Sequence, residues 1–169
     1  MAHIARGLTP TRLPATLTNM PDTLHPSGLS EDAVAELQKR ATNAASNSYS
    51  PYSHFRVGAA LSIQVPGYPE NIIVTGCNVE NSSFRLTTCA EQAAIATAVG
   101  LYGPAIRIVA VAVANLNSAA SMPCGACRQT ILEFCDPEAA WIFYPAEKGM
   151  AAESTLSTLL PAAFRLHQP

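Results

Sequence analysis

Two segments of the sequence decide its fold and its chemistry: Thr88-Cys89-Ala90-Glu91-Gln92-Ala93-Ala94-Ile95 and Met122-Pro123-Cys124-Gly125-Ala126-Cys127-Arg128-Gln129. Each segment places a cysteine where a helix is expected to begin. Together they offer three thiolates, Cys89, Cys124 and Cys127, and thiolate is a ligand that zinc prefers. No fourth protein ligand is evident, so one position of a tetrahedral ion stays open for water, as it does in catalytic zinc sites.

The carboxylate of Glu91 follows Cys89 by two residues. On the first turn of a helix, this spacing sets Glu91 beside the metal-bound water and not on the metal, where it can carry protons. Two alternatives stay open at this point. A lone Cys-x-x-Cys pair also serves redox chemistry or structural zinc, and Glu91 could simply cap its helix.

Length and composition predict one domain that associates with copies of itself. A chain of 169 residues is long enough for one domain with a substantial core and too short for two ordinary ones. Hydrophobic residues make up 49% of the chain and charged residues only 13%. We therefore expect part of the apolar excess to lie in subunit contacts, which makes a homo-oligomer the natural expectation.

Charge and cysteine content exclude several classes of partner. The formal net charge is -2 and the basic residues are scattered, so we expect no nucleic-acid partner. No apolar run approaches the length of a membrane span, and the N-terminus lacks the hydrophobic segment of a secretory signal. Five cysteines form an odd set without dense disulfide spacing, which favours a reducing, cytoplasmic location. Cys77 and Cys135 are then expected to be core thiols.

Residues 1–28 are expected to form an irregular N-terminal arm, and residues 29–169 the catalytic domain. The arm contains Pro10, Pro14, Pro21 and Pro26 and shows no regular apolar period. It has two arginines and no acidic residue before Asp22, which leaves a mitochondrial leader as an alternative to a poorly ordered tail. An arm that lies along a neighbouring subunit is a third possibility.

Hydrophobic periodicity predicts an α/β domain with a mixed sheet and helices on both of its faces. Ser30 is expected to cap the first helix. The run of alanines after Cys89 leaves almost no polar face, so that helix is expected to be buried on most sides. The expected strands are 57–65, 71–77, 106–114, 140–144 and 150–155, and the expected helices are 31–47, 89–99, 124–134 and 156–161.

Further motifs accompany the two cysteine segments. They are Pro51-Tyr52-Ser53-His54-Phe55-Arg56-Val57-Gly58-Ala59-Ala60, Gly76-Cys77-Asn78-Val79-Glu80-Asn81 and Leu159-Leu160-Pro161-Ala162-Ala163-Phe164. The whole set resembles the zinc-dependent cytidine deaminases of the compact, three-cysteine kind. The resemblance implies a three-layer α/β/α fold with a mixed five-stranded sheet and a homotetramer. It also implies hydrolytic deamination of cytidine and 2′-deoxycytidine in pyrimidine salvage.

The resemblance also implies roles for particular residues. Zn²⁺ is held by Cys89, Cys124 and Cys127, and Glu91 moves a proton from the zinc-bound water to N3 of the cytosine ring while hydroxide adds at C4. The implied substrate-binding residues are Phe55 against the base, Asn78 and Glu80 at the ribose, the backbone of Ala90 at the base edge, and Phe84 and Phe164. Asn78 and Glu80 could instead satisfy a turn. Phe55 and Phe164 could instead be core residues, and Phe84 stands where the family more often has tyrosine.

The residue after the glutamate departs from the family. Relatives with three cysteines usually have arginine there, whereas Gln92 is neutral. Three thiolates on a divalent ion leave a net negative centre, so we expect Arg128, together with Arg85, to carry more of the compensating charge. Two other functions stay open: deamination of another aminopyrimidine nucleoside by the same fold, and a non-catalytic protein held together by structural zinc.

Overall fold

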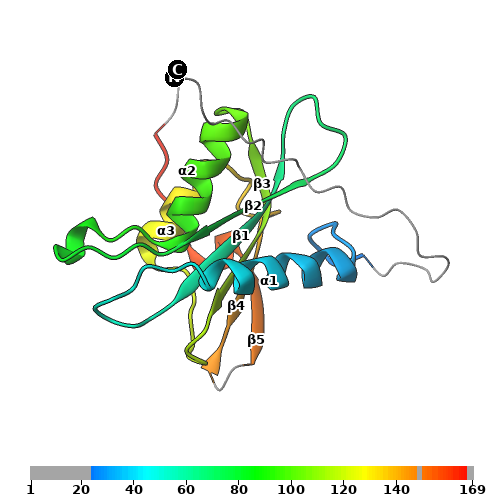
Figure 1. The fold of residues 1–169 in the computed structure, drawn as a ribbon. Helices are drawn as coiled ribbons and strands as arrows, with labels where there is room; N and C mark the ends of the chain where they lie inside the picture. Colours follow the sequence, from blue (N-terminus) through cyan, green and yellow to red (C-terminus); the bar gives the residue numbers. More distant parts are fainter. Residues whose placement is uncertain (1–23, 148–149, 167–169) are drawn as a thin grey trace, which may run out of the picture.

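A five-stranded sheet covered by helices on both faces forms the centre of the computed structural model, which describes residues 24–147 and 150–166 (Figure 1). The strands are β1 (Val57–Gln64), β2 (Ile72–Cys77), β3 (Arg107–Asn115), β4 (Trp141–Pro145) and β5 (Ala151–Thr155). The helices are α1 (Glu31–Ala45), α2 (Ala90–Tyr102), α3 (Gly125–Leu132) and α4 (Leu156–Leu159), with a 3₁₀ turn, η1 (Phe84–Leu86). The expected mixed α/β architecture is confirmed.

Strand directions explain how the two cysteine segments meet. The strand order is β2-β1-β3-β4-β5, and only β3 and β4 pair in parallel. Because β2 and β3 both pair antiparallel with β1, they run in the same direction on either side of it. Helix α2 follows β2 and helix α3 follows β3, so both helices begin at the same edge of the sheet. Ligand sites in α/β sheets form at this carboxyl edge.

Alternation along β1 separates the two faces of the core. Ala59, Leu61 and Ile63 belong to the cluster that packs against α2 and α3, while Ala60 belongs to the cluster under α1. On β3, the partner of Ser62 is Ala110, but the partner of the next residue, Ile63, is Ile108, so β3 contains a β-bulge at this point. The extra residue in β3 reverses the alternation of its side chains between the two faces of the sheet. As a result, Ile108 and Val111 both face α2 and α3, although they are three residues apart.

Helix α1 agrees with its sequence pattern, and α2 departs from it in one respect. Ser30 caps α1 as expected, because its Oγ accepts a hydrogen bond from the Ala33 N–H at 3.2 Å. Helix α2 is not buried on most sides within one chain. It packs only one face on the sheet, and Leu101 on the outer face is 59% exposed. No helix in residues 24–147 and 150–166 is long and apolar enough to cross a bilayer.

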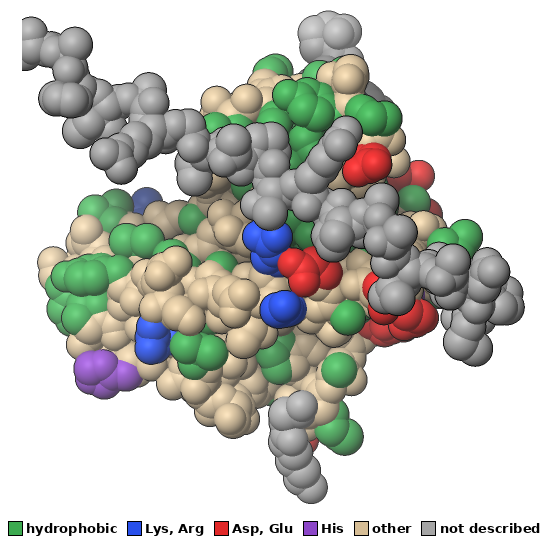
Figure 2. Space-filling view, turned by 45° about the vertical axis from the view of Figure 1, so that its right-hand side comes forward, with side chains coloured by type: hydrophobic (Ala, Val, Ile, Leu, Met, Phe, Trp, Pro, Cys, Tyr) green, Lys and Arg blue, Asp and Glu red, His purple; other side chains and the backbone are tan. Residues whose placement is uncertain are grey.

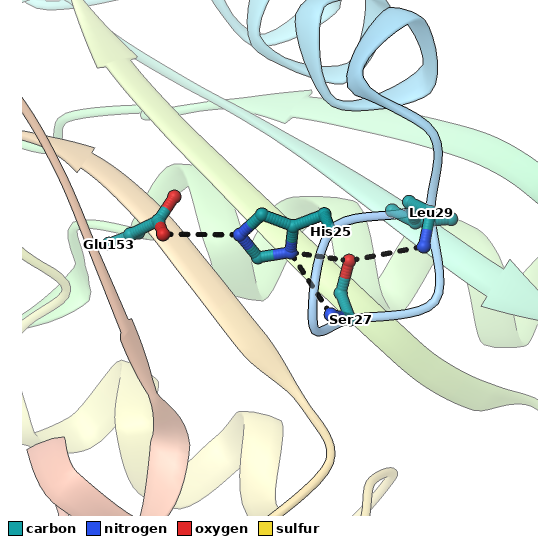
Figure 3. Close-up of polar contacts among 4 residues, drawn as sticks. All are labelled: His25, Ser27, Leu29 and Glu153. Carbon is teal, nitrogen blue, oxygen red and sulfur yellow. Dashed lines mark hydrogen bonds and ion pairs between the residues drawn. The ribbon is translucent and has the colours of Figure 1, made fainter. Parts of the chain in front are cut away.

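Residues 24–28, the described part of the expected N-terminal arm, contact the sheet through a buried histidine. The ring of His25 packs edge-on against Trp141 at 4.7 Å between centroids, and its side chain is 7% exposed. The Ser27 N–H donates to Nδ1 at 3.0 Å, so this nitrogen is an acceptor (Figure 3). Nε2 therefore carries the proton and donates to Glu153 on β5 at 3.1 Å. The domain boundary at residue 28 stays a prediction, and residues 1–23 lie outside the described residues.

Replacing His25 with alanine is expected to lower the free energy of unfolding by about 2–3 kcal/mol, because an aromatic contact and a buried hydrogen bond are lost together. Urea denaturation of the zinc-loaded protein, followed by Trp141 fluorescence, measures this change. The control is Glu153→Gln, which keeps an oxygen acceptor for the Nε2 proton and should change the free energy of unfolding much less. A His25→Ala protein as stable as the wild type contradicts the anchoring role.

Candidate active site

The two helix starts bring the three expected zinc ligands together. Cys89 is the N-cap of α2 and Cys124 is the N-cap of α3, and neither side chain makes a capping hydrogen bond. Cys127 lies one turn into α3 and is fully buried. All three sulfurs lie within 4.8 Å of one another. A tetrahedral zinc ion with Zn–S bonds of about 2.3 Å needs sulfurs about 3.8 Å apart, so the cluster fits zinc in both geometry and ligand chemistry.

The surroundings of the cluster favour the thiolate form of Cys89. A hydrogen bond from the Cys127 side chain lowers the pKa of Cys89 below its ordinary value, against the effects of burial and of the Glu91 charge. The same contact with Cys89, together with burial, raises the pKa of Cys127. Free N–H groups at the starts of α2 and α3 also favour anions at both N-caps.

The carboxyl group of Glu91 lies on the first turn of α2 and is almost completely buried, with 4% of the residue exposed. Burial raises its pKa above the ordinary value, although hydrogen bonds from its own backbone and from Cys127 act in the opposite direction. A raised pKa makes a carboxyl group a stronger base and so favours its use as a carrier of protons. The geometry therefore suits Glu91 to proton transfer beside the metal cluster.

A cavity of about 230 Å³ opens beside the thiolates and Glu91. Phe55, Asn78 and Ala90 contribute to its lining, and so do Ser121 and Met122 from the turn before α3. A larger hollow of about 410 Å³ lies at the turn between β1 and β2, but none of the three cysteines lines it. The smaller cavity is therefore the candidate active site, because of these two cavities it is the one that adjoins the metal cluster.

Asn78 and Glu80 are both buried, and their hydrogen bonds go largely to the loop of residues 46–56. Asn78 Oδ1 accepts from the Val57 N–H at 2.9 Å and from Ser48, and its Nδ2 donates to the Phe55 carbonyl at 2.8 Å. One N–H of Asn78 remains available to a ligand. Glu80 is not among the residues that line the cavity. Its contact with a substrate stays a prediction.

Phe84 and Phe164 lie away from the cavity of their own chain. Phe84 is 73% exposed on η1, and Phe164 is 67% exposed in the segment after α4. The Phe164 carbonyl accepts from Gln129 Nε2 at 2.8 Å, and Arg165 donates to two carbonyls at the end of α3. Hydrogen bonds within the chain thus fix the backbone around Phe164, while its ring stays exposed. Contact of either ring with a substrate stays a prediction.

Arg128 and Gln92 flank the metal cluster in different ways. The Arg128 guanidinium donates to the carbonyls of Pro123 at 2.8 Å and Leu159 at 2.7 Å, and to the Met122 sulfur at 2.9 Å. Its described hydrogen bonds therefore hold the turn before α3, and none of them reaches a cysteine. Gln92 is half-buried on the first turn of α2, and Arg85 is exposed. Compensation of the thiolate charge by Arg128 stays a prediction.

Comparison with known proteins identifies the family. Residues 32–143, which include all three cysteines, match the family model described as the cytidine and deoxycytidylate deaminase zinc-binding region. The chain belongs to this family. It is 40% identical to the cytidine deaminase of Sporosarcina psychrophila over 134 residues, and this match covers 79% of the chain and 90% of the relative. It is also 40% identical to the cytidine deaminase of Mycobacterium tuberculosis over 130 residues, and this match covers 77% of the chain and 88% of the relative.

Solved structures of the family have the same fold as this deaminase. The cytidine deaminase of Mycobacterium tuberculosis matches with a TM-score of 0.66 and 39% identity, covering 79% of this chain and 98% of that one. The enzyme of Burkholderia pseudomallei matches with a TM-score of 0.66 and 35% identity, covering 77% and 98%. With the thiolate cluster inside the zinc-binding region, this protein is a zinc-dependent deaminase.

Sequence reasoning gave no role to Val57, Thr87 and Val113, which line the cavity, and none to Ser53, which bonds to residues beside it. Ser53 stands in the quoted motif around Phe55, but it was given no role. In the structure its hydroxyl donates to Glu80 and accepts from the Phe55 N–H. The signal available in the sequence was a hydroxyl side chain two residues before an aromatic residue expected to contact the base. A turn in which a serine side chain bonds to the backbone two residues on is a common local structure.

Proposed function

We propose that this deaminase hydrolyses cytidine and 2′-deoxycytidine to uridine and 2′-deoxyuridine, with release of ammonia, and that it serves pyrimidine salvage. One observation carries the proposal. A single cavity has the thiolate cluster and Glu91 on one side and Phe55 and Asn78 on the other. Chemistry at an exocyclic amine and recognition of a base and sugar can therefore take place in the same space. The curated relatives at 40% identity named as cytidine deaminases support this choice of substrate.

The positions of the side chains support the following roles. A zinc ion held by Cys89, Cys124 and Cys127 would supply the Lewis acidity that makes water a nucleophile near neutral pH. Glu91 takes one proton from the water that adds at C4 and passes it to N3 of the base, and it then carries the second proton of that water to the 4-amino group, which leaves as ammonia. Phe55 packs against the base, the backbone at Ala90 and Ser121 contacts its edge, and the spare N–H of Asn78 donates to the sugar.

A substrate panel tests this function. The zinc-loaded protein is incubated with cytidine, 2′-deoxycytidine, cytosine, CMP and adenosine, and the loss of ultraviolet absorbance is followed together with ammonia release. We expect turnover of the first two compounds and little of the others. Activity on adenosine in place of cytidine contradicts the substrate assignment. Tight zinc binding without ammonia release from any nucleoside supports a non-catalytic protein held together by structural zinc. Activity confined to a modified aminopyrimidine nucleoside supports a deaminase of that other substrate.

We propose that the active form is a homotetramer in which neighbouring chains complete one another's sites. Several large apolar side chains are exposed in the single chain, including those of Tyr49, Tyr52, Phe84, Leu86 and Phe164. Tyr52 and Phe84 lie together, with ring centroids 6.1 Å apart, and exposed apolar side chains of this size are typical of a subunit interface. Light scattering measures the mass in solution. A monomer with full activity contradicts the tetramer and the participation of a neighbour's Phe84 or Phe164.

A nucleoside is the proposed partner, and we expect neither nucleic acid nor a membrane. On the face shown in Figure 2, Lys and Arg side chains are few and are interspersed with acidic and uncharged groups. A nucleic-acid footprint requires clustered basic residues.

All five cysteines are free, and three of them are needed as thiolates, so we propose a reducing, cytoplasmic location.

The neutral residue after Glu91 gives a further prediction about the zinc centre. Gln92→Arg is expected to add a positive charge on the first turn of α2, near three thiolates, and to slow the loss of zinc to a chelator. The rate of zinc loss, followed with a colorimetric indicator, measures this effect without reference to activity. The control is Ala96→Arg on the exposed side of α2, which places the same charge about one helical turn farther along the helix from Cys89. Equal rates of zinc loss in Gln92→Arg and the wild type contradict the charge hypothesis.

A further inference from the structure

Two connecting segments lie together beside the active site. Residues 46–56 join α1 to β1 and residues 78–89 join β2 to α2, and both extend from the same side of the molecule (Figure 1). Their backbones are paired, because the Tyr49 N–H donates to the Asn78 carbonyl at 3.1 Å and the Glu80 N–H donates to the Tyr49 carbonyl at 2.8 Å. The first segment carries Phe55 into the cavity, so whatever fixes it also fixes one wall of the site.

The side chain of Glu80 accepts several hydrogen bonds from this loop. Glu80 Oε2 accepts from the Tyr52 N–H at 2.9 Å and the Ser53 N–H at 3.2 Å. Glu80 Oε1 accepts from the Ser53 hydroxyl. These contacts hold the loop around one buried carboxylate. Hydrogen bonds to an ionised acceptor are stronger than bonds between neutral groups, so a carboxylate suits this task better than an amide.

The Ser53 hydroxyl connects Glu80 to the backbone of Phe55. While it donates to Glu80, its oxygen accepts from the Phe55 N–H at 3.0 Å. On the other side of the same residue, Asn78 Nδ2 donates to the Phe55 carbonyl at 2.8 Å. The N–H and the carbonyl of Phe55 are therefore hydrogen-bonded to the side chains of Ser53 and Asn78, and the Ser53 hydroxyl is in turn bonded to Glu80. The orientation of the aromatic wall depends on both connections.

We propose that Ser53 is a positioning residue for the deamination: its hydroxyl links Glu80 to the backbone of Phe55 and so fixes the aromatic wall of the cavity. Ser53 itself is exposed and does not line the cavity, so it acts through its neighbours and not on the substrate. The inference rests on the proposed function, because it concerns how a nucleoside base is held during the reaction.

The charge of Glu80 provides a readout that a purely structural role would not change. The Ser53 hydroxyl is the main reason that the pKa of Glu80 lies below its ordinary value, and the Tyr52 and Ser53 N–H groups and the charge of His54 act in the same direction. Partial burial opposes them. A protonated Glu80 turns one acceptor into a donor and weakens the hold on the loop. Removing the hydroxyl raises this pKa, so protonation then begins at a higher pH.

Steady-state kinetics with cytidine on zinc-loaded Ser53→Ala, Ser53→Thr and wild-type enzymes test the proposal. We expect Ser53→Ala to raise KM by roughly 10- to 100-fold, the effect of losing a hydrogen bond to a charged group. The kcat should change little, because Glu91 and the thiolates are untouched. The acidic limb of the kcat/KM profile should move to higher pH. Ser53→Thr keeps a hydroxyl and should restore both properties. Ser82→Ala removes an exposed hydroxyl of the neighbouring segment and serves as the matched control.

The possible outcomes separate this proposal from the proposed function. If the wild type does not deaminate cytidine, the proposed function fails and the role of Ser53 in it fails as well. If the wild type is active and Ser53→Ala has the same KM and pH profile, only the positioning role is overturned. An equal loss of kcat/KM at every pH, without rescue by threonine, also overturns it, because that pattern indicates general damage to the loop. Circular dichroism and zinc content establish that each variant is folded and loaded.

Discussion

Glu91→Gln is expected to lower kcat by at least the roughly 10²- to 10⁴-fold that loss of acid-base catalysis produces, while the protein keeps its fold and its zinc. Glutamine has nearly the same size and shape as glutamate, so it fits the buried position on the first turn of α2. It cannot take a proton from water or give one to the base. The effect should therefore fall on kcat far more than on KM.

Two measurements accompany the kinetics of Glu91→Gln. Metal analysis should show the same zinc content as in the wild type, because the three thiolates and not the carboxylate are the proposed ligands. The matched control is Glu133→Gln at the end of α3, where the carboxylate is exposed and lies outside the cavity, and it should leave kcat unchanged. A Glu91→Gln enzyme with near wild-type kcat refutes proton transfer by this residue, and one without zinc indicates a role in holding the metal.

Gly58→Ala is expected to lower the free energy of unfolding by about 3 kcal/mol or more, at the upper end of the usual cost of overpacking a core. Gly58 lies on β1 directly beneath α1. A Cβ at this position would overlap the backbone of Ala41 and Ala45, and backbone atoms of a packed helix cannot turn aside as a flexible side chain can. The helix would have to move off the sheet, which would open the core under Leu37.

A second glycine in the same protein provides the control for Gly58→Ala. Gly100 lies on the exposed side of α2, and a Cβ there would meet nothing within 4 Å. Because alanine stabilises a helix more than glycine does, Gly100→Ala should stabilise the protein by about 0.5–1 kcal/mol. Urea denaturation of the zinc-loaded proteins measures both changes. Equal stability of Gly58→Ala and the wild type would mean that α1 does not pack on β1 as closely as described.

The elements and the metal ligands could be predicted from the sequence because both depend on short-range patterns. A capping serine followed by apolar residues at helical spacing predicted α1, and Val-rich or alternating runs predicted the strands. Cys89, Cys124 and Cys127 were chosen because thiolates at the starts of two helices suit zinc. Cooperation among distant segments was harder to predict. The alanine-rich run of α2 suggested burial on most sides, yet local hydrophobicity does not specify which neighbours cover a helix.

By itself, the sequence determined the order of strands and helices and predicted the zinc ligands and the proton carrier, because all of these depend on residue types at fixed spacing. Only the tertiary structure decided how they meet. Strands β2 and β3 run the same way on either side of β1, and this direction brings the starts of α2 and α3 to one edge of the sheet. It also decided that Ser53 bonds to Glu80, 27 residues away, since such contacts depend on the path of the whole chain and not on local preference.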